Sequence, residues 1–403
     1  MPKPTRKPAP VKKPRPDFPL FPHARGYWAK KVRQRLHYFG KVADDPQGKV
    51  ALELWLKQRD DLLAGRTPRV HPEGLTIKDL ANRFLTNRRT KLDSGELAAT
   101  TFADYHAACA RLVRFFGPGR LVADLDATDF ERLRASMAKD WSPVTLHNEI
   151  GRIRVVLRYT TENLLIPGPI RYGSAFAKPS RKTLQAARAV RGVRMFEAEE
   201  IRAMLAAAPA TMKAMILLGL NCGFGNLDVA KLPATALDLQ SGWVNFPRPK
   251  TAIPRRCSLW PETVQAIRAA IAQRPNPKDP ESGKLVFLTV RGVTWGKRTV
   301  GVPDAPDGKL RKNTADPICQ EFRKLLKRLG LYQPSRGFYS LRHTLETIGG
   351  EARDQVALDA IMGHVRDDMA SVYRERIGGD RLLAVVNRVH EWLWPVAEAK
   401  ESK

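Results

Sequence analysis

The most informative part of the sequence is YSLRH at residues 339–343, followed by MGHVRDDMASVY at residues 362–373. These stretches supply Arg342 and His343 and place His364 nine residues before Tyr373. A tyrosine that attacks phosphate needs a proton acceptor, and the nonbridging phosphate oxygens need fixed positive donors. Guanidinium offers those oxygens a bidentate fork. Each residue alone is usually a packing residue, but the ordered set indicates phosphoryl transfer.

The ordered set resembles the catalytic domain of tyrosine recombinases, the phage-integrase class, over residues 196 to about 380. The HxxRH motif of that family is matched by Tyr339, Arg342 and His343. Its Gly-His pair, nine residues ahead of the tyrosine, is matched by His364 with its preceding glycine and by Tyr373. Residues 76–165 look like the helical core-binding domain of that family, and the N-terminal unit is similar to the small arm-binding domain of some integrases. The resemblance thus covers roughly 300 of the 403 residues, and the second half carries the specific motifs.

The resemblance implies a role for each matched residue. Tyr373 would form a 3′-phosphotyrosine, Arg342 would hold the phosphate, and His364 would assist as a donor or base. Lys250, in RPKTAIPRR, would protonate the leaving 5′-oxygen, and Tyr339 would donate a hydrogen bond to the phosphate. No metal and no cofactor are implied. Two plainer interpretations stay open, in which Lys250 is a solvated turn lysine and Tyr373 packs in the core.

The sequence departs from the family pattern at two positions. Residues 222–228 read CGFGNLD, so Gly225 stands where the first arginine of the family is expected, although Asp228 matches the acidic residue that follows it. Tyr339 replaces a histidine, which is a mild change because a phenol also donates a hydrogen bond. Loss of a preorganised charged donor is serious. The candidates to replace it are Arg255, Arg256 and Arg336.

The charge of the chain indicates a polyanionic partner. Lysine and arginine number 69 against 41 acidic residues, a net charge of +28. Counterion release makes such binding strong at low salt, although acidic membranes and RNA would be attracted too. The expected partner is double-stranded DNA. The residues expected to contact it beside the catalytic set are His147, Arg154, Arg158, Arg255, Arg256 and His343. A solvated basic flank is the alternative for the first three, and structural packing for His343.

Several other classes of protein are not indicated. The apolar runs are too short to span a membrane, and the proline-rich N-terminus lacks the apolar stretch of a secretory signal. The four cysteines lie far apart without paired spacing, so neither disulfides nor a zinc site is expected. A cytoplasmic, nucleoid-associated protein is the expectation.

The composition and periodicity predict a mainly α-helical protein with an α+β catalytic domain. The expected order is a disordered basic arm (1–22), a small arm-type DNA-binding unit (23–70), a helical core-binding domain (71–165), a linker rich in Pro, Gly and Ser (166–191), the catalytic domain (192–395) and a tail (396–403). The names of these parts follow from the resemblance.

Local patterns predict the elements within these parts. Strands are expected over residues 27–40, with Trp28, Val32, Leu36 and Tyr38 as their apolar residues. A helix over residues 51–63 would have the stripe Leu52, Trp55, Leu56, Leu62 and Leu63. Ser142 and Pro143 form a helix start, followed by the stripe Leu146, Ile150, Ile153, Leu157 and Leu164. Residues 196–208 should be helical, residues 243–259 should form strands with a turn, and residues 316–394 should be mainly helical.

The function predicted from these observations is site-specific DNA breakage and rejoining. Assembly as a homotetramer on DNA is implied by the resemblance alone. Two alternatives stay open. One is a recombinase-derived DNA-binding protein that no longer cuts, which Gly225 supports. The other is a relaxing enzyme similar to type IB topoisomerases, which shares the chemistry.

Overall fold

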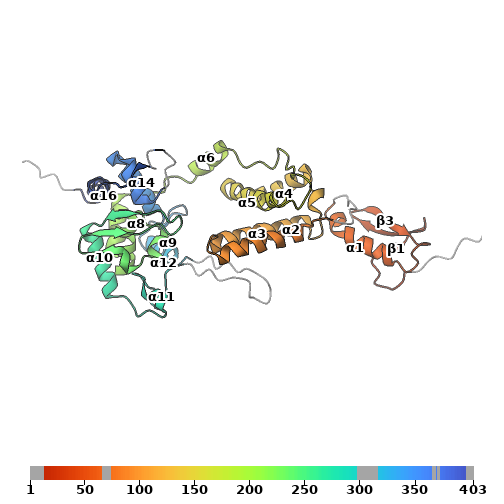
Figure 1. The fold of residues 1–403 in the computed structure, drawn as a ribbon, viewed down its shortest axis with the longest axis horizontal. Coiled ribbons are helices and arrows are strands. Elements are labelled where there is room, and N and C mark those ends of the chain that lie inside the picture. The colour runs from red at the N-terminus through yellow and green to blue at the C-terminus, as the bar shows by residue number, and fades with distance from the viewer. Residues whose placement is uncertain (1–12, 66–73, 297–315, 365–368, 370–372, 396–403) are drawn as a thin grey trace, which may run out of the picture. The chain divides into compact units, whose positions relative to one another are not determined.

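The computed structural model describes residues 13–65, 74–296, 316–364, 369 and 373–395. It forms two compact units that divide between residues 187 and 188 (Figure 1). Helices predominate beside two small antiparallel sheets, which confirms the predicted fold class. Most of the predicted basic arm and the whole predicted tail lie outside the described residues. Within the described part, no helix combines the length and the apolar character needed to cross a bilayer.

The first unit begins with a three-stranded sheet of β1 (Phe21–Pro22), β2 (Tyr27–Val32) and β3 (Arg35–Lys41). The expected strands are present, but Leu36 and Tyr38 are exposed and Phe39 is buried in their place. The turn at residues 33–34 has positive φ at both positions and closes a two-residue hairpin. Even-numbered residues of β2 therefore pair with odd-numbered residues of β3, so Leu36 shares the outer face with Lys31.

The predicted helix over residues 51–63 is α1 (Lys49–Leu63). Trp55 and Leu62 are buried against the sheet together with Ala51, but Leu56 and Leu63 of the predicted stripe are exposed. Each of these two leucines directly follows a buried residue and is therefore rotated by about 100° from the buried face. Together with Phe18, Leu20, Trp28 and Phe39, the buried residues of α1 form a separate small core.

The rest of the first unit is helical, as predicted. It contains α2 (Ile77–Asp93), α3 (Ala99–Phe116), the 3₁₀ turn η1 (Val122–Asp124), α4 (Ala127–Asp140) and α5 (Pro143–Glu162). The Ser142 side chain accepts a hydrogen bond from Thr145 N at 3.3 Å, which confirms the predicted helix start. The stripe of α5 is buried except for Leu164, which is 89% exposed with φ 51° because the helix ends two residues earlier.

The segment predicted as a linker contributes to this helical core. Phe176 is fully buried there, and Ile166, Ile170 and Tyr172 pack against the core. The segment continues into α6 (Arg181–Ala189), none of whose side chains is buried.

The second unit carries the segments that resemble a catalytic domain. Its helices and 3₁₀ turns are α7 (Ala198–Ala207), α8 (Ala210–Asn221), α9 (Asn226–Ala230), η2 (Ala234–Ala236), α10 (Pro261–Ala272), α11 (Pro280–Gly283), α12 (Pro317–Arg328), α13 (Ser340–Gly349), η3 (Gly350–Ala352), α14 (Gln355–Met362) and α16 (Gly379–Leu393). The strands β4 (Leu237–Asp238), β5 (Trp243–Asn245) and β6 (Arg256–Ser258) form the second sheet (Figure 1). The predicted strand-and-turn segment and helical segments are confirmed where the residues are described.

Helix α8 lies at the centre of this unit and is buried along most of its length. It packs against α10 and α13, and Gly219 allows the close approach of α13, because a Cβ there would lie 2.9 Å from Leu341 Cδ1. At the end of α8, Asn221 Nδ2 donates to Ser258 O at 2.9 Å, and Asn221 Oδ1 accepts from Trp260 N at 2.9 Å. This buried amide joins α8 to β6, so the glycine-rich segment after α8 lies beside the sheet.

Candidate active site

Arg342 is held from several directions in the interior of the second unit. Its side chain projects from the first turns of α13, and the residue is only 2% exposed. Nη1 donates to Gly223 O and Nη2 donates to Met362 O, each at 2.6 Å. Burial lowers the pKa of the Arg342 guanidinium, and the charges of Arg248 and Arg255 act in the same direction. A guanidinium nevertheless stays protonated in proteins, so Arg342 is a fixed positive donor.

His364 lies directly beside Arg342 in a defined tautomer. Arg342 Nη2 is 3.0 Å from His364 Nε2, and His364 Nδ1 is 3.4 Å from Asp359 Oδ1. Because arginine can only donate, Nε2 of His364 must accept this hydrogen bond, and Nδ1 therefore carries the proton in the neutral ring. The sequence analysis did not identify Asp359. The only sign of it in the sequence is its position five residues before His364.

One cluster of this region has the composition of a metal site. The ligand atoms of Glu346, Asp359 and His364 lie within 4.8 Å of one another. The hydrogen bond between Asp359 and His364, together with the 3.8 Å approach of Glu346 Oε2 to His364 Nδ1, accounts for this grouping without an ion. The expectation that the chain uses no metal therefore stays a prediction.

Two glycines shape the backbone around Arg342. Gly223 and Gly363 have φ +64° and +63°, values that favour glycine. A Cβ on Gly223 would also lie 2.5 Å from Met362 Sδ, and one on Gly363 would lie 2.7 Å from Arg255 Cδ. The turn that carries His364 therefore packs directly on the side chain of Arg255.

Gly225 and Tyr339, the two departures from the family motif, lie next to each other. Gly225 has an ordinary φ of −86°, and a Cβ there would lie 3.1 Å from both Tyr339 Cδ2 and Cε2. Tyr339 is 46% exposed, and its ring makes an edge contact with His343, at 5.6 Å between ring centroids. Asp228 Oδ2 accepts from Gly225 N at 2.7 Å, so the acidic residue caps the start of α9.

The three arginines suggested as replacements for residue 225 have different surroundings. Arg255 is buried, and its Nη2 donates to Asp228 Oδ1 at 3.1 Å. Arg256 is exposed and stacks on the Trp243 ring at 4.1 Å from its centroid, because neighbouring residues of a strand point to opposite faces. Arg336 forms an ion pair with Glu200 and stacks on Phe196 at 4.3 Å. Of the three, only Arg255 contacts the turn that carries His364.

Arg248 is a further arginine of this cluster, and sequence reasoning missed it. Its Nη1 donates to Gly363 O at 3.2 Å. It precedes the turn at residues 249–252, where Arg248 N donates to Ile253 O at 2.8 Å and Ala252 has φ 57°. Lys250 is exposed in this turn, as the strand-and-turn prediction requires. The sign of Arg248 in the sequence was its place in the RPK triplet at residues 248–250.

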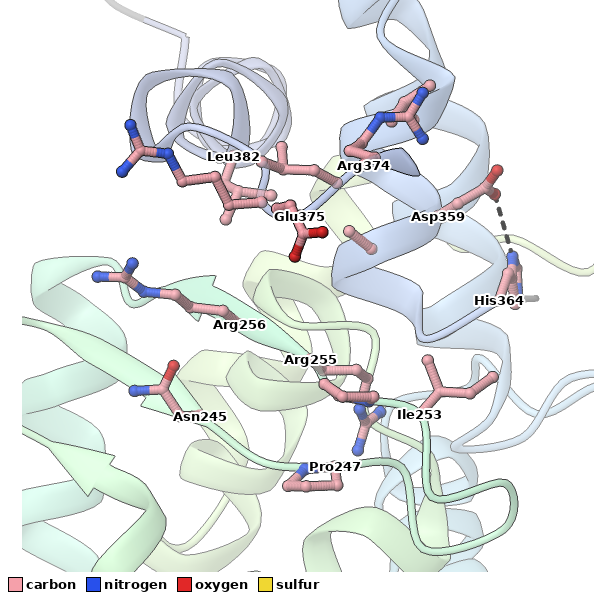
Figure 2. A pocket seen from close by; sticks show the side chains of 15 residues that line it. Asn245, Pro247, Ile253, Arg255, Arg256, Asp359, His364, Arg374, Glu375 and Leu382 are labelled. Atoms are coloured by element: carbon pink, nitrogen blue, oxygen red, sulfur yellow. Dashed lines mark hydrogen bonds and ion pairs between the residues drawn. The ribbon is translucent and has the colours of Figure 1, made fainter. Parts of the chain in front are cut away.

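The remaining candidates lie at the surface or beside it. Tyr373 is 76% exposed, and the residues directly before it lie outside the described part. Figure 2 shows a pocket of about 530 Å³ lined by residues that include Arg255, His364 and Arg374. Arg374 directly follows the tyrosine, so the pocket lies between the buried cluster and the segment that carries the candidate nucleophile.

The residues expected to contact DNA outside this cluster belong to α5 and α13. Arg154 donates to Phe176 O at 2.6 Å and lies 5.5 Å from the Tyr172 ring centroid, so it holds the segment after α5 in place. Arg158 is exposed. His147 is half-buried, and its Nδ1 has no partner among the described residues. Burial lowers the pKa of His343, and the charges of Arg194 and Arg342 lower it further.

Comparisons with known proteins concern the family and the fold. Residues 194–377 match the model of the phage integrase family. The Tn1549 transposon integrase, in complex with a circular intermediate DNA, is similar with a TM-score of 0.55 and 16% identity, covering 78% of this chain and 100% of that one. The lambda integrase dimer bound to a COC′ core site is similar with a TM-score of 0.54 and 14% identity, covering 90% of this chain and 96% of that one.

The lambda integrase tetramer bound to a Holliday junction has the same TM-score of 0.54 and 14% identity, covering 91% of this chain and 98% of that one. At these identities the likeness concerns the fold. A search of curated proteins found no match. Residues 194–377, which match the phage integrase family model, include Arg342, His364 and Tyr373, and the solved integrases share the fold of this chain.

Proposed function

We propose that the protein is a site-specific DNA recombinase that breaks and rejoins strands through a 3′-phosphotyrosine at Tyr373. The observation that carries this proposal is the buried Arg342–His364 pair, anchored on the carbonyls of Gly223 and Met362. A guanidinium held this rigidly is costly to bury and serves best where negative charge must be stabilised. The exposed Tyr373 follows nine residues after His364.

The proposed reaction exchanges one phosphodiester for another. The Tyr373 oxygen loses its proton and bonds to phosphorus, while the bond from phosphorus to the 5′-oxygen breaks and that oxygen takes a proton. Arg342 stabilises the charge on the nonbridging oxygens, and exposed Lys250 supplies the proton to the leaving oxygen. His364, with a lone pair on Nε2 in its neutral form, assists the proton transfers. Rejoining is the reverse step with a new 5′-hydroxyl.

Double-stranded DNA is the proposed partner. Two features support it: the net charge of +28, and the similarity to integrases whose structures contain DNA. The lambda integrase structure on a Holliday junction is a tetramer, which supports a homotetramer of this chain on DNA. The hairpin of β2 and β3 carries Lys30, Lys31 and Arg35 in its strands and Arg33 in its turn, and this unit would make a separate DNA contact.

A second function is favoured by one observation, the absence of an arginine at residue 225. A protein without that donor could bind the same DNA without cutting it. The retained set of Tyr373, Arg342, His364 and Lys250 favours the active enzyme, since a protein that only binds needs none of these groups in this arrangement.

Trapping of a covalent intermediate distinguishes the two functions. The wild-type protein is incubated with nicked suicide duplexes drawn from the DNA that flanks its own gene, and a denaturation-resistant adduct is sought. Tyr373→Phe should abolish the adduct while leaving DNA affinity unchanged, because it removes one oxygen and little volume. The absence of an adduct from wild-type protein on all such duplexes would favour the protein that only binds.

A further inference from the structure

We infer that Arg255 is a catalytic residue that contacts the scissile phosphate and takes the place of the arginine missing at residue 225. The inference rests on the proposed function for the identity of the phosphate. It depends on four observations, namely the anchoring of Arg255, its terminal nitrogen without a partner among the described residues, its position relative to Arg342, and the pocket that it lines.

Arg255 is anchored to the same carboxylate that caps the glycine. Asp228 Oδ2 accepts from Gly225 N, and Asp228 Oδ1 accepts from Arg255 Nη2. Arg255 Nε donates to Phe246 O at 3.0 Å, and the guanidinium lies 4.5 Å from the centroid of the Phe224 ring. The guanidinium of Arg255, the residue directly before β6, is thus held beside position 225 by Asp228, which matches the acidic residue of the family motif.

The terminal nitrogen Nη1 of Arg255 is buried and has no hydrogen-bond partner among the described residues. Other arginines in the described part also have a buried nitrogen without a partner, but in each of them it is Nε, with its single hydrogen: Arg88, Arg120, Arg154, Arg274 and Arg336. In Arg255 the nitrogen is a terminal NH₂ with two donors. A buried charged donor without an acceptor is costly, and a bound anion would satisfy it.

Arg255 and Arg342 flank the same turn. A Cβ on Gly363 would collide with Arg255 Cδ at 2.7 Å, and the next residue, His364, is hydrogen-bonded to Arg342. Arg248 donates to the carbonyl of Gly363, and its Cβ also lies close to the position of a Gly363 Cβ. Three arginine side chains therefore contact this turn, and the charges of Arg248 and Arg255 both disfavour the charged form of Arg342. A phosphate placed among them would remove this repulsion.

The space beside Arg255 is open to a ligand. The side chain lines the pocket of about 530 Å³ together with His364 and with Arg374, the residue after the candidate nucleophile (Figure 2). A phosphodiester in this pocket would have Arg255 and His364 in its wall. Arg256 lines the same pocket, but it is exposed and its guanidinium stacks on Trp243. Arg336 is ion-paired with Glu200.

The test compares Arg255→Lys with the matched variant Arg336→Lys. Lysine keeps a positive charge beside Asp228 but removes Nη1 and the planar fork. The rate of adduct formation on the suicide duplex should fall about 10²- to 10³-fold for Arg255→Lys, the range found when one such donor is removed. Arg336→Lys makes the same chemical change at another buried, ion-paired and ring-stacked arginine, and should keep the wild-type rate. A wild-type rate for Arg255→Lys would overturn the inference.

A second substrate separates a catalytic role from a structural one. A methylphosphonate at the scissile position carries no negative charge, so the gap between wild type and Arg255→Lys should shrink on it. A gap of unchanged size on the neutral substrate would mean that Arg255 acts through folding and would overturn the inference.

A third measurement does not depend on cleavage. Inorganic phosphate should raise the unfolding temperature of wild type and Arg336→Lys equally, and that of Arg255→Lys less. If the wild type forms no adduct but this difference is found, the proposed recombinase fails and the phosphate site stands. Equal shifts in all three proteins would overturn the site.

Discussion

The ring of Tyr339 lies against the backbone of Gly225, with Cδ2 and Cε2 each 3.1 Å from the position that a Cβ of residue 225 would occupy. The two departures from the integrase motif therefore share one space. The larger side chain at residue 339 fills part of the volume that a side chain at residue 225 would use. Arg255 binds one oxygen of the Asp228 carboxylate, and Gly225 N binds the other. Gly225, Tyr339, Asp228 and Arg255 therefore form one connected group of contacts.

Gly225→Arg should fold, because residue 225 has φ −86°, a value that residues other than glycine adopt readily. In the wild-type background the new arginine would compete with Arg255 for Asp228 and meet the Tyr339 ring, so adduct formation should not rise. In the Arg255→Lys background it should rise, by about tenfold or more, because neighbouring residues couple strongly. Single-turnover adduct assays on both backgrounds, with thermal unfolding as the folding control, measure this coupling. An increase confined to the wild-type background would contradict it.

Asp359→Asn should slow adduct formation by roughly 10- to 100-fold, the value of one hydrogen bond to a charged group. The carboxylate accepts from His364 Nδ1 and so leaves Nε2 free to accept from Arg342. An amide can present its NH₂ group instead and favour the opposite tautomer. Glu346→Gln is the control, because Glu346 lies farther from the ring, at 3.8 Å, and should have a smaller effect. Equal losses in the two variants would argue against the tautomer as the cause.

Arg154→Ala and Arg158→Ala should separate stability from DNA binding. Arg154 donates to Phe176 O at 2.6 Å, so its loss should lower the free energy of unfolding by about 1–3 kcal/mol. Arg158 is exposed on the same helix, and its loss should leave stability unchanged while weakening DNA binding. Chemical denaturation and a DNA titration on each variant provide both quantities. Unchanged stability of Arg154→Ala would show that its contacts with residues 172–176 contribute little.

Affinity for duplex DNA should fall steeply as salt increases. The net charge of +28 implies several phosphate contacts, and six such contacts would cost about 10³-fold between 50 and 200 mM salt. The slope of log affinity against log salt concentration, measured by fluorescence anisotropy, gives the number of phosphate contacts. An affinity that does not change with salt concentration would show that binding is not mainly electrostatic.

Deletion of residues 1–70 should leave a folded protein with weaker or relocated DNA binding. The strands β1–β3 and α1 have their own core around Trp28, Phe39 and Trp55, separate from the helical core that follows. Arg120 would lose its 3.5 Å contact with Asp61 but keep Asp129 at 3.2 Å. Circular dichroism and a thermal unfolding curve report folding, and footprinting reports binding. An unfolded product would show that the N-terminal unit belongs to the main core.

Much of this protein was determined locally and could be predicted from the sequence. The helix start at Ser142, the buried stripe from Leu146 to Leu157 and the turn around Lys250 depend on capping, helical periodicity and turn-forming residues within a few positions. The motif spacing singled out Arg342, His364 and Tyr373 as candidates, and the structure brings Arg342 and His364 into contact. The exposure of Leu36 could not be predicted in this way, because it depends on how β3 pairs with β2 across a two-residue turn.

The arrangement of the site was decided only by tertiary structure. Nothing in the sequence distinguishes Arg255 from Arg256 or Arg336, since each is an arginine in a basic segment. The difference arises because the side chain of Arg255, directly before β6, meets a carboxylate 27 residues away, while Arg256 meets a tryptophan and Arg336 a glutamate. The energy of a charged side chain depends on the groups around it and on their distances, and those distances exist only after long-range packing.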